Sequence, residues 1–158
     1  MSISTDVAYG PLGHNGGGFW SFRPKNKINQ IVISFGGRGN NNPIGITFSA
    51  TKNDGSKDTL TIGGGGTETN VTHNDTINID GEDEYLTEIS GTFGAFASSD
   101  NVLRSIKFTT NAREFGTYGP NVGTPFNFQA QNGNKIVGFF GRSGYYIDAI
   151  GTYNAPDY

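Results

Sequence analysis

One short segment near the end of the chain, residues 141–150, combines residue types that a small-ligand site needs. Tyr145 and Tyr146 stand between Gly144 and Asp148, and an apolar run follows the aspartate. An ionised carboxylate accepts hydrogen bonds through both of its oxygens, and charge-assisted bonds are roughly twice as strong as neutral ones. Glycine lets the backbone turn and approach a ligand closely. The segment therefore predicts a site that offers backbone N–H donors, an aromatic wall and one charged acceptor to the same small volume.

Other residues that could do chemistry give weaker signals. His14 and His73 are the two histidines and lie in separate predicted loops, which argues against a metal site or a proton-transfer pair. The glycine run 63–66 is followed by neither Lys-Ser nor Lys-Thr, so a phosphate-binding loop is disfavoured. The acidic run 82–84 lacks the regular ligand spacing of a calcium site, and we interpret it as a solvated turn. We expect no catalytic residue, no metal and no cofactor.

Composition favours one all-β domain over residues 1–158. The chain has 158 residues, including 25 Gly, 12 Phe and 7 Tyr, which is typical of many short strands joined by tight turns. No amphipathic helix of ten residues is evident. We expect a short flexible tail over residues 154–158.

Charge and cysteine content limit the location and the partners. There is no cysteine, the first six residues lack a basic and an apolar signal region, and no apolar run approaches membrane-spanning length. We therefore expect a cytoplasmic or nuclear protein without a signal peptide or membrane contact. The net charge of −3, with scattered Lys and Arg, argues against a nucleic-acid partner.

An internal repeat organises the chain. The pattern Ile-x-x-x-Phe-Gly occurs at residues 31–36, 89–94 and 136–141, each time followed by a polar loop and a second apolar alternation. The second alternations begin at Asn42, Arg104 and Asp148. Each unit predicts a β-hairpin with a glycine-bounded connection. Because the spacing of the units is uneven, we expect three small antiparallel sheets that close around one shared core.

Several motifs together resemble the jacalin-related plant lectins. They are Gly-Pro-x-Gly-x-Asn-Gly-Gly at residues 10–17, the Tyr-Gly-Pro and Gly-Thr-Pro-Phe pieces of residues 118–126, and the segment 138–153 that contains the Gly-x-x-x-Asp loop. The segment 15–24 is most similar to the mannose-specific branch found in bindweeds. The resemblance covers essentially the whole chain. It implies the β-prism I fold, which has three four-stranded Greek-key sheets about a pseudo-three-fold axis.

The resemblance also implies non-enzymatic sugar binding at one end of the prism. The implied carbohydrate-binding residues are Gly17, Gly144, Tyr145, Tyr146 and Asp148, with a further contact at Ala97 in the loop 93–99. Asp148 would accept hydrogen bonds from two sugar hydroxyls, the two tyrosines would donate backbone N–H groups, and the Tyr145 ring would form a wall. A side chain at Gly17 would obstruct the sugar.

The repeat and the family resemblance together predict the number of sites and the sugar. By sequence alignment of the units, the position of Asp148 is occupied by Asn42 in the first unit and Arg104 in the second, so we expect one site per chain. The chain is uninterrupted through residues 16–18, which in the family accompanies a preference for mannose and glucose. One shallow site should bind one sugar with a Kd on the order of millimolar. Useful avidity would then require a homodimer or tetramer.

One other function remains open at this point. A structural or defence-related protein–protein adaptor could use the same fold to bind a polypeptide. A glycosidase would need a pair of carboxylates beside the scissile bond, whereas the loop 144–148 holds one. We therefore expect no enzymatic activity.

Overall fold

The computed structural model describes residues 6–36, 41–64 and 71–158, and every regular element within these ranges is a β-strand. The remaining residues include part of the first-unit loop, 37–40, and Gly65 and Gly66 of the glycine run, so expectations for them lie outside the described residues. No helix in the described ranges is long and apolar enough to span a membrane. The expected all-β class is confirmed.

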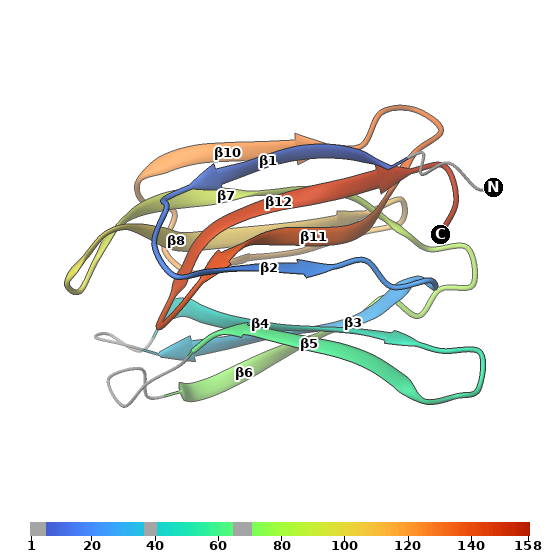
Figure 1. Ribbon diagram of the computed structural model, residues 1–158, viewed down its shortest axis with the longest axis horizontal. Helices are drawn as coiled ribbons and strands as arrows, with labels where there is room; N and C mark the ends of the chain where they lie inside the picture. The colour runs from blue at the N-terminus through green and yellow to red at the C-terminus, as the bar shows by residue number, and fades with distance from the viewer. Residues whose placement is uncertain (1–5, 37–40, 65–70) are drawn as a thin grey trace.

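Within the described residues, twelve strands form three antiparallel sheets of four strands each (Figure 1). The first-unit sheet has the order β5 (Lys57–Gly63), β4 (Asn42–Thr51), β3 (Ile28–Gly36), β6 (Val71–Asn78). The second-unit sheet has the order β10 (Thr124–Gln129), β7 (Leu86–Phe96), β8 (Ser99–Thr110), β9 (Glu114–Tyr118). The third-unit sheet has the order β1 (Val7–Gly13), β12 (Ile147–Ala155), β11 (Lys135–Ser143), β2 (Gly18–Phe22). All three orders follow the Greek-key pattern expected for the prism.

The third-unit sheet differs from the other two because both ends of the chain build it. Its central hairpin, β11 and β12, is flanked by β1 on one side and β2 on the other. The N- and C-terminal ends of the described chain accordingly lie near each other, at the right of Figure 1. The start of β12, the end of β1 and the start of β2 all lie at the opposite, left-hand end.

One phenylalanine from each sheet meets in the shared core. Phe48, Phe108 and Phe139 are fully buried, and the Phe139 ring lies 4.7 Å from that of Phe48 and 6.2 Å from that of Phe108. Trp20 and Phe22 also stack on Phe48 and so belong to the core packing. Burying each such side chain contributes about 1.5–3 kcal/mol, so each sheet becomes stable only when it packs on the others.

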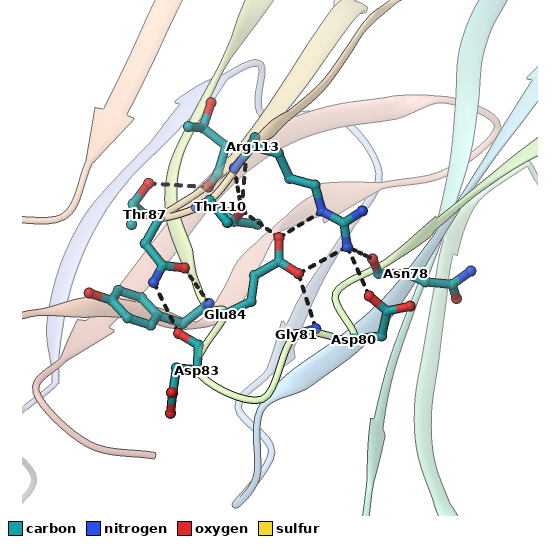
Figure 2. A network of polar contacts seen from close by, with 12 residues as sticks. Asn78, Asp80, Gly81, Asp83, Glu84, Thr87, Thr110 and Arg113 are labelled. Atoms are coloured by element: carbon teal, nitrogen blue, oxygen red, sulfur yellow. Dashed lines mark hydrogen bonds and ion pairs between the residues drawn. The ribbon is translucent and has the colours of Figure 1, made fainter.

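A network of charged side chains links the loop between β8 and β9 to the segment between β6 and β7 (Figure 2). This segment lies at the right-hand end of the prism in Figure 1. The Arg113 guanidinium donates from Nε to Glu84 Oε2 at 2.9 Å and from Nη2 to Asp80 Oδ1 at 2.9 Å. Thr110 Oγ1 donates to Glu84 Oε2 at 2.7 Å. The hydrogen bonds from Arg113 lower the pKa of Glu84 to about 2, against the effect of burial. The expectation of a solvated turn is wrong for Glu84, which is 5% exposed because Arg113 and Thr110 satisfy its carboxylate.

The tail is shorter than residues 154–158. β12 continues through Ala155, and Asn154 is fully buried with its Nδ2 donating to the carbonyl oxygen of Val7 at 3.0 Å. Asn154 pairs with Val7 of β1 and Ala155 pairs with Lys135 of β11, so both residues belong to the third-unit sheet. Tyr158 is 38% exposed and its ring lies 4.9 Å from Lys135 Nζ. Partial burial raises the pKa of Tyr158 to about 12.

Candidate functional site

A β-bulge in each unit sets the geometry of the left-hand end. Pairing between the two central strands skips one residue of the second strand in every sheet. The skipped residues are Ile44 in β4, Arg104 in β8 and Asp148 in β12. Bulges bend a strand and re-aim a side chain, and they are frequent beside functional sites. The three units therefore present three different side chains from one structural position.

The register corrects one equivalence that the sequence suggested. Arg104 does correspond to Asp148, as expected. Asn42 does not, because the first-unit bulge lies two residues later, at Ile44. Ile44 is fully buried and apolar, so the first unit still lacks a carboxylate at this position.

Asp148 lies against two glycine-containing loops. A Cβ on Gly16 would lie 2.8 Å from Asp148 Oδ1, and a Cβ on Gly17 would lie 2.8 Å from Asp148 Oδ2. A Cβ on Gly144 would lie 3.6 Å from the Cα of Gly17. Gly17 has a φ of +68°, a conformation that favours glycine. The fold thus brings Gly17, Gly144 and Asp148 together from opposite ends of the sequence.

Hydrogen-bonding groups without partners surround this contact. Within the described ranges, the Asp148 carboxylate accepts no hydrogen bond, and the backbone N–H groups of Tyr145 and Tyr146 donate none. Burial raises the pKa of the Asp148 carboxyl above its ordinary value, while the His14 and Arg142 side chains oppose that shift. The carboxylate is therefore available as an acceptor to a ligand that carries hydroxyl groups.

Two residues that were not predicted as parts of the site, Arg142 and His14, hold the loops around Asp148. Arg142 donates from Nε to the carbonyl oxygen of Gly16 at 3.1 Å and from Nη2 to that of Gly17 at 2.8 Å. The backbone N–H of His14 donates to the carbonyl oxygen of Asp148 at 2.7 Å. Arg142 and Gly17 are 125 positions apart, so no local pattern could reveal the contact.

The two tyrosines of the loop differ in environment. The Tyr145 side chain is 58% exposed, and its carbonyl oxygen accepts a hydrogen bond from the Gly64 N–H at 3.0 Å. Tyr146 is only 7% exposed, and its carbonyl oxygen accepts a bond from the Gly144 N–H at 3.0 Å. Only the Tyr145 ring is thus exposed enough to form a wall beside a ligand.

The second unit reaches this loop through the hairpin of β7 and β8. The Phe96 ring meets the Tyr146 ring edge-on, with 5.3 Å between the centroids. Ala97 follows at the exposed tip of the hairpin, with a φ of +53° that is rare for a residue other than glycine. The structure therefore places Ala97 next to a residue that touches the loop.

Metal chemistry finds no support in the described part of the chain, where no group of three or more His, Asp or Glu side chains could hold an ion. One carboxylate, free backbone donors and an exposed aromatic ring suit reversible binding of a polyhydroxylated ligand.

Comparisons with known proteins agree with this interpretation. A family model described as a Jacalin-like lectin domain matches residues 9–153. The jacalin-related lectin Calsepa of Calystegia sepium is 64% identical over 154 residues, which cover 98% of each chain. A crystal structure of Calsepa lectin in complex with a biantennary N-glycan superposes with a TM-score of 0.90 at 63% identity, covering 98% of this chain and 99% of that one. A mannose-binding jacalin-related lectin from Ananas comosus gives a TM-score of 0.79 at 32% identity, covering 97% of this chain and 99% of that one.

Proposed function

This chain belongs to the jacalin-like lectin family, and we propose that it binds mannose, glucose and mannose-containing glycans at one site per chain. It is a carbohydrate-binding protein and not an enzyme, as the sequence led us to expect. The choice of site is supported by the Asp148 carboxylate, which accepts no hydrogen bond from the described residues, beside the Tyr145 and Tyr146 N–H groups, which donate none to them. Residues 1–158 would act as one lectin domain.

In the proposed complex the sugar lies between the loop 144–148 and Gly17. Two adjacent hydroxyls donate to the two oxygens of Asp148 and accept from the N–H groups of Tyr145 and Tyr146. The exposed ring of Tyr145 covers the C–H face of the sugar. Gly144 and Gly17 keep the volume beside Asp148 free of side chains. Ala97, at the tip of the second-unit hairpin, would contact the next residue of a longer glycan.

Three facts support mannose as the preferred sugar. One relative is described as mannose-binding, and another has been crystallised with a biantennary N-glycan. The chain also runs unbroken through residues 16–18. The charge of the site excludes neither mannose nor glucose. The preference between these sugars therefore depends on which hydroxyls contact Asp148.

Weak single sites make assembly useful. With one site per chain and a Kd on the order of millimolar, a homodimer or tetramer would gain avidity through effective concentration. The β1 strand offers an exposed sheet edge for such an assembly, with Val7 45% and Leu12 47% exposed. Sedimentation velocity tests this assembly.

We also infer a cytoplasmic location, which a fluorescent fusion in plant cells tests.

Titration calorimetry with methyl α-mannoside tests the sugar and the site together. The wild-type chain should bind with a Kd on the order of millimolar, and galactose should bind more weakly. Asp148→Asn keeps the shape of the side chain but removes its charge, and should lose at least about tenfold in affinity. Wild-type affinity in Asp148→Asn would refute the site, and a chain that binds galactose better than mannose would refute the sugar.

A further inference from the structure

We propose that Arg104 is a positioning residue for the sugar-binding loop, acting from the second unit through Phe96 and Tyr146 without touching the sugar. This inference rests on the proposed function, because it concerns the same site. Arg104 occupies the bulge position that Asp148 occupies in the third unit. The bulge residue of the third unit, Asp148, would then bind the ligand, and the bulge residue of the second unit, Arg104, would support the ligand-binding loop.

Arg104 is held on one side by a buried amide. Its Nε donates to Oδ1 of Asn42 at 2.8 Å, and Asn42 is fully buried at the start of β4. The Asn42 Nδ2 in turn donates to the carbonyl oxygen of Leu103 at 3.1 Å. The guanidinium is therefore fixed to the first-unit strand and to the second-unit backbone at once.

On its other side Arg104 holds the tip of the β7–β8 hairpin. Its Nη1 donates to the carbonyl oxygen of Ala95 at 2.6 Å, and its Cζ lies 5.1 Å from the centroid of the Phe96 ring. These contacts fix the backbone before Phe96 and the face of its ring. An arginine can make both because its planar fork donates in several fixed directions, whereas a lysine ammonium cannot.

Phe96 contacts the sugar-binding loop and so links the position of Arg104 to that of Tyr146. Its ring meets Tyr146 edge-on and belongs to a buried apolar cluster with Ile44, Val102 and Tyr146. Ile44 is the first-unit bulge residue, so the bulge residues of the first and second units both support Tyr146. The bulge residue of the third unit, Asp148, lies two positions after Tyr146 in the same loop.

The position of Tyr146 decides where the loop presents its donors. The Tyr146 carbonyl oxygen accepts the Gly144 N–H at 3.0 Å, which closes the turn that carries the free N–H groups of Tyr145 and Tyr146. Binding groups must stay within about 0.5 Å of their productive geometry to keep their hydrogen bonds. If the Phe96 ring shifts, Tyr146 and the turn can shift with it, and sugar affinity falls although every sugar-contacting residue is still present.

A pair of matched variants tests this inference. Arg113 also makes several charge-assisted bonds (Figure 2), and its Cζ lies 4.9 Å from the Phe115 centroid. It follows the end of β8 that is opposite to the tip of the β7–β8 hairpin. Arg104→Lys and Arg113→Lys should both lower the free energy of unfolding in urea. Only Arg104→Lys should weaken methyl α-mannoside binding, by about three- to tenfold. Arg113→Lys should stay within about 1.5-fold of the wild type.

Hydrogen exchange of the Gly144 amide gives a second readout that does not depend on the sugar. Exchange should be at least about fivefold faster in Arg104→Lys and unchanged in Arg113→Lys. Equal affinity losses in the two variants, or wild-type affinity and exchange in Arg104→Lys, would overturn the proposal. If the wild-type chain bound no mannoside, the proposed function would fail, and the Gly144 comparison alone would decide on Arg104. If Arg104→Lys does not fold, Phe96→Leu removes the ring contact and should give the same loss of affinity and protection.

Discussion

Gly17 lies against the carboxylate of Asp148 so closely that a single added methyl group would lie 2.8 Å from Oδ2. Gly17 lies in the loop between β1 and β2, Asp148 lies in β12, and the two meet because the third-unit sheet joins the opposite ends of the chain. The neighbouring Gly18 has no atom within 4 Å of the corresponding position. Two adjacent glycines therefore have opposite tolerance for a side chain.

Alanine substitution at these two glycines should separate their roles. Gly17→Ala should reduce methyl α-mannoside affinity by more than about tenfold and destabilise the fold by about 1 kcal/mol or more, because the φ of +68° is also unfavourable for alanine. Gly18→Ala should change neither by a measurable amount. Calorimetric titration and urea unfolding of both variants provide the test, and equal behaviour would contradict the geometry.

Sugar binding should weaken in acid at a higher pH than an ordinary aspartate would cause. Burial raises the pKa of Asp148, and only the ionised carboxylate accepts two hydroxyl donors. Affinity should therefore be constant around neutral pH and fall as the pH drops through this raised pKa. The fall should approach about tenfold per pH unit well below the pKa. Asp148→Asn should show a flat pH profile at low affinity, and a similar fall in that variant would assign the effect to another group.

Acid should also remove a stabilising interaction at the right-hand end of the prism. The pKa of Glu84 is about 2 in the fold and about 4.5 when unperturbed, so its contribution is fully present above about 4.5 and is lost as the pH falls towards 2. Glu84→Gln should lower the free energy of unfolding at pH 7 by about 1–3 kcal/mol, toward the lower figure because Arg113 is half-exposed. The difference from the wild type should shrink between pH 4.5 and 2. Glu82→Gln, in the same turn but exposed, is the matched control.

The buried amide that anchors Arg104 should matter more for stability than an exposed one. Asn42→Ala removes the acceptor for Arg104 Nε and the donor to Leu103, at a site with no access to water. We expect a loss of about 1–3 kcal/mol in the free energy of unfolding. Asn53→Ala, which removes the exposed bond from Asn26 Nδ2, should stay within about 0.5 kcal/mol. Urea unfolding at pH 7 measures both, and equal losses would contradict the prediction.

The sequence predicted the fold well because each hairpin is local. Alternating apolar residues and glycine-bounded turns define β3 with β4, β7 with β8, and β11 with β12, and all three hairpins are present. The sequence alignment of the three units was wrong where β-bulges shift the pairing of the strands, because residue spacing alone does not show the bulges. The bulges place Gly36 and Gly94 level with Gly144, so the Ile-x-x-x-Phe-Gly pattern of the third unit, which ends at Gly141, is three residues out of register.

Only the residues of one contiguous loop, and the residues that the family resemblance implied, could be predicted as parts of the site. The residues Gly144 to Asp148 are contiguous, and the fold does bring them beside Gly17. His14, Arg142 and Arg104 were not predicted as parts of the site, because their roles depend on contacts across the prism. Such contacts follow from sheet order and bulge position, neither of which a single sequence records.

The closure of the third-unit sheet by both chain ends has a consequence for biosynthesis. The strands β3 to β6 and β7 to β10 are contiguous in sequence, so their sheets can pair as they leave the ribosome, and domains generally fold from the N-terminal side first. β1 and β2 emerge earliest yet must wait for β11 and β12. Gly16 and Gly17 therefore cannot meet Asp148 until β12 has been made, and the proposed glycan site can form only from that point on.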